Sequence, residues 1–214
     1  MQTTEFSEIV WDFYAKHGRE LPWRTPEADG TFDPYKILVS ELMLQQTQVS
    51  RVVTKYHEFL QAFPTITDLA NASLGDVLRQ WSGLGYNRRA KFLWQAAGKI
   101  AQDFSGVFPR TQKELTSLPG VGVNTAGAIC AYAFNQPVAF VETNIRTVYI
   151  HHFFVDRTDV HDNELTPVIE QTVDTENPRE WYWALMDYGS HLKATLGNIS
   201  RNSKHHTKQS KFEG

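Results

Sequence analysis

Apolar side chains recur along most of this chain at the three- and four-residue spacing of helical faces. The first such face is formed by Phe6, Ile9, Val10, Phe13 and Tyr14. Gly18 follows this face and is placed to end the helix. Residues 33–63 keep the same spacing over a longer stretch, which predicts one or two long helices that begin near Pro34. Only residues 137–142 could form a strand, and they are few, so the pattern predicts an all-α fold.

Polar residues ahead of several apolar stretches indicate where helices begin. Three such starts are marked by Ser73 with Asp76, Thr111 with Glu114, and Asn177 with Pro178. A serine, threonine or asparagine at these places accepts hydrogen bonds from the free backbone amides of the first helical turn. A proline is tolerated just inside the helix because its missing N–H would have no partner there. We therefore expect a helix to begin at each pair.

The composition is that of a folded protein. The 214 residues are 41% hydrophobic and include six tryptophans, which is enough for one domain or two closely joined lobes. Cys130 is the only cysteine, which excludes an internal disulfide and any site that needs several thiolates. No run approaches the roughly 20 apolar residues of a membrane helix, and the first residues do not resemble a signal peptide. We therefore expect a cytoplasmic protein.

Charge is distributed unevenly along the chain. The net charge is −3, but residues 193–214 carry +4 and the preceding 192 residues carry −7. The segment 198–214 is polar, poor in aliphatic residues, and contains Lys204 and Lys208. A basic tail on an acidic body can bind phosphates, or it can be an ordinary solvated tail. The charge pattern alone leaves both interpretations open.

Residues 111–134 contain a stiff turn, PGVG, between two helical stretches. Gly120 and Gly122 permit left-handed backbone angles and let another backbone come close. The amides around Asn124 and Thr125, at the start of the second stretch, can hold a phosphate oxygen with help from the helix dipole. No lysine is needed for such a site. The same spacing also fits an ordinary turn between two helices.

Several motifs together resemble one family. They are LPWR at 21–24, DPYKILVSELMLQQTQVSRV at 33–52, FPTITDLANASLGDVLRQWSGLGY at 63–86, LPGVG at 118–122 and ALMDYG at 184–189. Over about residues 20–192 the chain resembles the helix-hairpin-helix (HhH-GPD) superfamily of DNA glycosylases, most closely its adenine glycosylases of the MutY type. The resemblance implies two helical lobes and a target base that enters the cleft between them. The implied parts are a six-helix barrel lobe at 30–137 with the helix-hairpin-helix at 111–134, a second lobe from 1–29 and 138–197, and a basic tail at 198–214.

Cleavage of an N-glycosidic bond needs an acid for the leaving base and a carboxylate for the positive charge that grows on the sugar. Glu41 fits the acid, because it shares a helical face with aliphatic residues such as Ile37, Leu38 and Leu44. A carboxyl group in apolar surroundings has a raised pKa and can keep its proton near neutral pH. From the spacing alone, Glu41 could equally lie at the edge of that face and reach solvent or Arg51. The resemblance implies the acid.

Glu142 occupies the position at which the family carries its catalytic aspartate, so the resemblance implies the sugar-side carboxylate. Its additional methylene would move the carboxylate about 1.5 Å further out, and a misplacement of that size can lower the rate about a hundredfold. Asn144 matches an asparagine of the adenine glycosylases. It could hydrogen-bond Glu142 or water, or it could cap the helix that follows.

The resemblance, the hairpin and the charge of the tail together indicate which residues contact DNA. They are Gln45, Gln46, Tyr86, Asn87, Arg88, Gly120, Gly122, Asn124, Thr125, Lys204 and Lys208. The two glutamines match residues that fill the gap left by a flipped base, although they could be ordinary glutamines on a helix surface. Asn124 stands where bifunctional relatives keep the lysine that forms a Schiff base. We therefore expect hydrolysis of the glycosidic bond without strand cleavage.

Two features depart from the adenine glycosylases. Those enzymes hold an iron–sulfur cluster with four cysteines, whereas Lys193 lies near the first expected thiolate here, so we expect no cluster. We expect the basic tail to take its place and to pack near Trp181, Trp183 and His191. The chain also ends before the domain that recognises 8-oxoguanine in those enzymes. As in relatives, a sodium or potassium ion is expected at the hairpin, on the backbone carbonyls of Thr116, Leu118 and Val121.

These observations lead to one main hypothesis and two alternatives. We predict a monofunctional DNA glycosylase that flips a base, first of all a mismatched adenine, out of duplex DNA and hydrolyses its glycosidic bond. The base could instead be a deaminated or alkylated one, or thymine or uracil opposite guanine. The alternative from another class is a protein that binds DNA lesions without catalysis. We expect a monomer, associated with the nucleoid in the cytoplasm.

Overall fold

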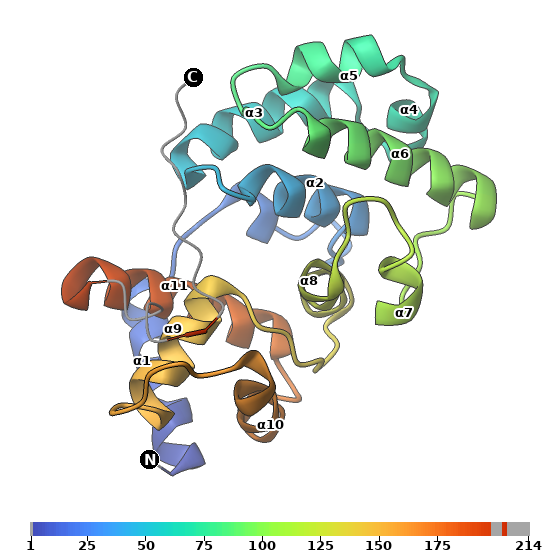
Figure 1. The fold of residues 1–214 in the computed structure, drawn as a ribbon. Coiled ribbons are helices and arrows are strands. Elements are labelled where there is room, and N and C mark those ends of the chain that lie inside the picture. The colour runs from blue at the N-terminus through green and yellow to red at the C-terminus, as the bar shows by residue number, and fades with distance from the viewer. Residues whose placement is uncertain (1, 198–202, 205–214) are drawn as a thin grey trace. The chain divides into compact units, whose positions relative to one another are not determined.

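The chain forms helices joined by turns, as Figure 1 shows. The computed structural model describes residues 2–197 and 203–204, and within them there is no strand, so the predicted all-α fold is confirmed. Residues 137–142 are irregular, because no partner strand is available among the described residues. The elements in chain order are α1 Thr3–His17, the 3-10 turn η1 Pro22–Arg24, α2 Pro34–Leu44, α3 Val49–Ala62, α4 Ile66–Asn71, α5 Leu74–Trp81, α6 Arg88–Asp103, α7 Gln112–Leu115, α8 Val123–Phe134, α9 Thr143–Phe153, α10 Asp162–Thr172 and α11 Pro178–Leu196.

The helices group into two compact units. The terminal unit contains residues 1–20 and 135–214, and the central unit contains residues 21–134. The central unit therefore begins before residue 30, because the ring of Trp23 is buried against that of Tyr56 (centroids 5.5 Å apart) and holds η1 on α3. It ends before residue 137, because the Tyr182 hydroxyl donates to the carbonyl of Val138 (2.7 Å) within the terminal unit.

In the central unit, helices α2 to α8 enclose an apolar core. The stretch 33–63 forms two helices, with the break at residues 45–48. Helix α2 begins at Pro34, and the Asp33 side chain accepts the amide of Tyr35 (2.8 Å) as its N-cap. Helix α2 is central, because it packs on α3, α6 and α8. The fully buried side chains of this core include Leu38, Leu42, Phe59, Trp81 and Leu93.

The three predicted helix starts are confirmed, because α5, α7 and α11 begin directly after Ser73, Thr111 and Asn177. Ser73 Oγ accepts the amide of Asp76 (3.1 Å), and Thr111 and Glu114 form a reciprocal capping box. Asn177 is the N-cap of α11 with Pro178 in the first turn, as predicted, but its side chain makes no capping hydrogen bond. The carboxylate of Asp174 lies three residues earlier and accepts the amides of Glu176 (2.9 Å) and Asn177 (2.8 Å), which orders the turn before the helix.

In the terminal unit, α1 packs on α10 and α11 and contacts α9 through Phe6, so the first helix and the last three helices share one core (Figure 1). Phe6 is fully buried, with its ring 5.1 Å from that of Tyr149 and 5.9 Å from that of Trp181. The buried carboxylate of Asp187 accepts the backbone amide (2.8 Å) and the Nε (2.7 Å) of Arg19, which fixes the chain just after α1. Of the helices in the described residues, none has the length and apolarity needed to cross a membrane.

Candidate active site and DNA-binding residues

Glu41 lies on α2 in the central unit. Its side chain is half-buried, and it follows the buried residues Ile37 and Leu38 by one helical turn. Leu44, one turn further on, is also half-buried. The carboxyl is therefore partly shielded from water and carried by a helix that is held on three sides. This is a rigid position from which an acid can deliver a proton.

Gln45 and Gln46 follow the last residue of α2 and lie in the loop before α3. The alternative that they are helix-surface glutamines is therefore wrong. Gln46 is exposed and has a positive φ of 57°, an uncommon conformation for a side-chain-bearing residue. Tyr86, in the loop before α6, shares both properties, with φ at 49° and 42% of its surface exposed. Exposed residues with a strained backbone of this kind persist only where the surrounding structure holds them.

The structure joins these two loops through Arg89, which the sequence reasoning missed. The guanidinium is buried and donates to the carbonyls of Leu42 (2.9 Å), Met43 (2.8 Å) and Gln45 at the end of α2. It also donates to the Thr47 hydroxyl (3.0 Å) and to the carbonyls of Leu84 (3.0 Å) and Gly85 (3.1 Å). One side chain therefore satisfies the free carbonyls after α2 and fixes the loop that carries Tyr86. A signal was present in the sequence, because Arg89 occupies an apolar-face position in register with Leu93, Ala96, Ala97 and Ile100.

Asn87 and Arg88 are exposed at the start of α6. The guanidinium of Arg88 lies over the ring of Phe92, 4.8 Å from its centroid. Phe92 also contacts the hairpin, because a Cβ added to Gly120 would come within 2.7 Å of the Phe92 Cβ. Phe92 of α6 therefore contacts both Arg88 and the hairpin.

The hairpin between α7 and α8 is pinned by the buried side chains Leu115, Leu118 and Val121. Gly120 has a φ of +79° and no room for a side chain, so the fold itself requires glycine there. Gly122 differs, since it has no positive φ and a Cβ there would meet nothing within 4 Å. Asn124 and Thr125 lie in the first turn of α8, at the positive end of the helix dipole.

The cation site stays a prediction. Thr116, Leu118 and Val121 offer only hard oxygen donors, which suit a sodium or potassium ion. The Leu118 carbonyl accepts the amide of Val121 (3.1 Å) and keeps a second lone pair for a cation. The donor set therefore fits such an ion, which would hold the hairpin turn from its carbonyl side.

Glu142 and Asn144 lie at the start of α9 in the terminal unit. Glu142 is the N-cap, and its Oε2 accepts the backbone amide of Asn144 (2.7 Å), so the alternative that Asn144 caps this helix is wrong. The capping bond also keeps the carboxylate close to the helix end, so the additional methylene does not extend it freely outward. The Asn144 Oδ1 accepts a hydrogen bond from Lys193 Nζ (2.7 Å) on α11. Arg146 forms a two-point ion pair with Asp162 on α10 (2.8 Å for each bond).

Gly189 sets how closely α11 approaches this turn. A Cβ added at Gly189 would lie 2.4 Å from the backbone oxygen of Asn144 and 2.8 Å from its carbonyl carbon. Both atoms belong to the backbone of α9 and cannot rotate away. The glycine in ALMDYG therefore places the Asn144 turn directly against α11.

We expect Gly189→Ala to destabilise the protein by about 2 kcal/mol or more, because α9 and α11 must move apart. The melting temperature should fall by about 5 °C or more. Gly98→Ala is the matched control, because a Cβ at that position in α6 meets nothing within 4 Å. Thermal unfolding followed by circular dichroism measures both, and equal melting temperatures would contradict this account of the packing.

Lys204 is the tail residue among the DNA-binding candidates that the structure places. It is exposed, and its backbone amide donates to the carbonyl of Val160 (3.1 Å) next to the buried Ser203. This contact holds the described part of the tail beside the segment before α10. Lys208 lies outside the described residues, as does the remainder of the tail expected near Trp181, Trp183 and His191.

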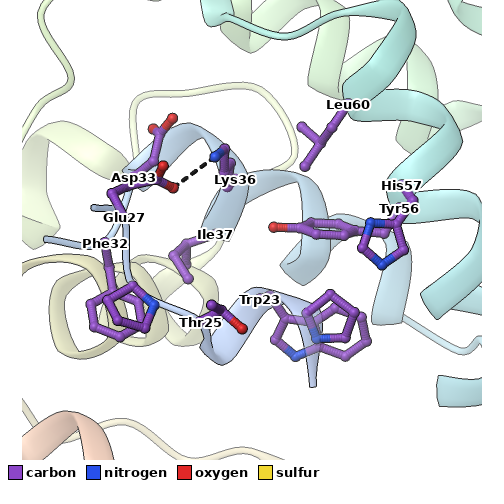
Figure 2. A pocket seen from close by; sticks show the side chains of 12 residues that line it. Trp23, Thr25, Glu27, Phe32, Asp33, Lys36, Ile37, Tyr56, His57 and Leu60 are labelled. Atoms are coloured by element: carbon purple, nitrogen blue, oxygen red, sulfur yellow. Dashed lines mark hydrogen bonds and ion pairs between the residues drawn. The ribbon is translucent and has the colours of Figure 1, made fainter. Parts of the chain in front are cut away.

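A cavity of about 310 Å³ lies between η1, α2 and α3 in the central unit (Figure 2). Trp23, Tyr56 and His57 line one side, and Lys36 forms an ion pair with Glu27 (2.7 Å) on the other. None of the predicted catalytic or DNA-binding residues lines this cavity. Its lining is therefore separate from the candidate residues, and its charged groups have partners, since Lys36 pairs with Glu27 and Asp33 caps α2.

Comparison with known proteins places the chain in a family. Residues 39–168, which include Glu41, the hairpin and Glu142, match the HhH-GPD superfamily of base excision DNA repair proteins. The chain belongs to this superfamily. The structure of a thermostable thymine-DNA glycosylase superposes with a TM-score of 0.79 at 25% identity, covering 94% of this chain and 92% of that one. An endonuclease III–DNA complex shares the fold, with a TM-score of 0.73 at 17% identity over 94% of this chain and 97% of that one.

The curated HhH-GPD relatives are adenine DNA glycosylases. The protein of Buchnera aphidicola (subsp. Baizongia pistaciae) is 34% identical over 195 residues, which cover 89% of this chain and 53% of the relative. The human protein is 37% identical over 196 residues, which cover 88% of this chain and 36% of the relative. The Mycobacterium tuberculosis protein is 45% identical over 140 residues, which cover 65% of this chain and 44% of the relative. The chain thus spans about half the length, or less, of these relatives.

Proposed function

We propose that this protein is a monofunctional DNA glycosylase that removes adenine from mismatches in duplex DNA by hydrolysis. The observation that carries the proposal is the similarity to adenine DNA glycosylases over a region that holds the two carboxyl groups, Glu41 and Glu142. The protein acts as a monomer in the cytoplasm on nucleoid DNA, and it works without an iron–sulfur cluster.

The reaction divides between the two carboxyl groups. Glu41 gives its proton to the leaving adenine as the bond to C1′ of the sugar breaks, so that the base departs neutral. Glu142 stabilises the positive charge on the sugar and accepts a proton from the attacking water. The water oxygen bonds to C1′ and leaves an abasic site. Asn124 has a carboxamide side chain at the position where bifunctional relatives have the amine of a lysine. No Schiff base therefore forms there, and the strand stays intact.

Thymine opposite guanine is the second candidate substrate. The observation that favours it is the superposition on the thermostable thymine-DNA glycosylase, which covers nearly the whole of both chains. Because thymine is a pyrimidine, a site built for it differs in depth from one built for adenine. One panel of duplexes therefore separates the two candidates.

The panel contains A·G, A·8-oxoguanine, T·G, U·G, hypoxanthine and alkylated-base duplexes, each labelled on the strand with the target base. After incubation, hot alkali converts abasic sites into strand breaks. We expect breaks in the adenine mismatches only after alkali. Breaks in T·G alone would favour the second candidate, breaks without alkali would contradict the hydrolytic mechanism, and tight binding with no product would favour a non-catalytic lesion binder.

The hairpin binds the DNA backbone in this proposal, and Gly122 tests it. Because the fold leaves room for a side chain at Gly122, the residue serves contact with the approaching phosphate and not internal packing. We expect Gly122→Ala to weaken duplex binding about tenfold, which corresponds to the loss of one charge-assisted hydrogen bond. Melting should stay within about 2 °C.

Gly98→Ala supplies the same chemical change in the same unit, away from the hairpin, and should bind DNA like the original protein. Fluorescence anisotropy with a labelled duplex measures both affinities. A Gly122→Ala protein that binds as tightly as the control would remove the hairpin from the proposed interface.

A further inference from the structure

Lys193 occupies an unusual place for a lysine. It lies on α11, and its ammonium contacts the first turn of α9, where the helix dipole is positive. Burial lowers the pKa of Lys193, while the charge of Glu142 acts in the opposite direction and Arg146 adds to the lowering. Burial, Arg146 and the positive helix end disfavour an ammonium here, and the charge of Glu142 offsets this only in part, because the pKa of Lys193 is lowered overall. This energetic cost indicates that Lys193 has a functional role at the site of Glu142 and Asn144.

The hydrogen bond from Lys193 decides how the Asn144 side chain is oriented. An ammonium can only donate, so the atom of Asn144 that faces it, 2.7 Å away, must be the oxygen Oδ1. The Nδ2 group is then turned the other way, toward Met186, whose sulfur lies 3.8 Å from it and is a weak acceptor. Nδ2 carries two hydrogens, so it keeps donor capacity for an oxygen atom beside Glu142.

The backbone under Asn144 is equally constrained. Its amide is bound by Glu142 (2.7 Å), and its carbonyl packs against Gly189 of α11. With the backbone fixed, the side chain of Asn144 could still rotate, and the hydrogen bond from Lys193 fixes its orientation. Three contacts from three positions, two to the backbone and one to the side chain, therefore hold this one asparagine, which is more order than a surface asparagine needs.

We propose that Lys193 is a positioning residue for the hydrolysis, acting through Asn144. Its ammonium holds the carboxamide with Nδ2 directed at the attacking water, and Nδ2 donates to the water oxygen while Glu142 accepts the water's proton. The inference rests on the proposed function, because it assigns the water's place in that reaction. Lys193 touches neither base nor sugar in this account and forms no covalent bond.

The test compares Lys193→Met, which keeps the length of the side chain but removes its charge, with Lys193→Arg, which keeps a donor. Lys16→Met is the matched control, because Lys16 is exposed in the last turn of α1 in the same unit. Single-turnover base release and duplex Kd are measured on the best substrate of the panel. We expect the rate of Lys193→Met to fall by about 10- to 100-fold with Kd within about threefold, since misplacement of a reacting group has effects of this size. Lys193→Arg should recover most of the rate.

Chemical rescue separates positioning from a general structural role. Lys193→Cys should be slow, and alkylation with 2-bromoethylamine should restore the rate by rebuilding an ammonium on a side chain of nearly the same length. Cys130, the only native thiol, is buried and should not react under native conditions. Recovery of the rate without a change in melting temperature would establish the role.

Two results would overturn the inference. One is a Lys193→Met protein that releases base at the rate of the Lys16→Met control. The other is a covalent DNA adduct, trapped with borohydride, that forms with the original protein and is lost in Lys193→Arg, which would make Lys193 a nucleophile. A failure of the proposed function looks different, because the unaltered protein then releases no base from any duplex.

Discussion

Replacing Glu41 with glutamine should reduce base release by at least about a hundredfold and leave duplex binding nearly unchanged. The reason is that the amide has the shape of the acid but no proton to give, and a positioned acid contributes about 10²- to 10⁴-fold to a rate. The neutral side chain should not weaken binding, since it removes a carboxyl group and introduces no bulk. Single-turnover kinetics on the best substrate and anisotropy on the same duplex measure the two quantities.

Glu58→Gln is the matched control for this experiment. Glu58 lies on α3 in the same unit as Glu41 and is exposed, where it pairs with Lys55 (2.8 Å). Surface pairs of this kind contribute little to stability, so the control should fold and react like the original protein. A Glu41→Gln protein within about threefold of this control would mean that the leaving base obtains its proton elsewhere, and the proposed division of roles would fail.

The helical face that Glu41 borders could be predicted because the features that place it are local, whereas the role of Glu142 came from the resemblance to the family alone. Pro34 and Asp33 begin α2, the apolar spacing fixes the face that Glu41 borders, and Glu142 lies directly before α9. The orientation of the Glu142 carboxylate could not be predicted from local sequence features. A longer side chain suggested a carboxylate further out, but the free amide of Asn144 binds it and keeps it at the helix end. Whether a side chain projects or folds back depends on the nearest available donor, which residue type alone does not specify.

The interactions that escaped prediction join residues far apart in the chain. Lys193 and Asn144 are 49 positions apart, and Arg89 is 46 positions from Met43. Helical periodicity identifies which residues share a face of one helix, but it does not identify which helix packs on that face. The break after Leu44 illustrates this, because the apolar spacing continues through 33–63 while the chain turns at Gln45 and Gln46. What stabilises that turn is a guanidinium supplied by α6.

Arg89→Met should therefore destabilise the protein strongly, by about 3–5 kcal/mol, although methionine fills a similar volume. The buried carbonyls of Leu42 and Leu84 lose their donor, and each unsatisfied buried acceptor costs about 1–3 kcal/mol. Arg89→Lys should recover only part of the loss, because one ammonium with three donors does not span both loops as the planar guanidinium does. Urea unfolding measures these differences, with Arg79→Met as the control from the exposed surface of α5.

The same substitution should change the DNA-binding loops before it unfolds the protein. Gln46 and Tyr86 hold positive φ angles that a free loop would relax, and the contacts of Arg89 with both loops maintain them. Amide hydrogen exchange in Arg89→Met should therefore rise most at residues 45–48 and 84–87, and duplex affinity should fall under conditions where the protein is still folded. Unchanged exchange in both loops, together with an unfolding free energy equal to that of Arg79→Met, would mean that the loops are held by other contacts. If hydrogen exchange rose in one loop alone, Arg89 would stabilise only that loop, because the loss of a guanidinium that supports both loops must affect both.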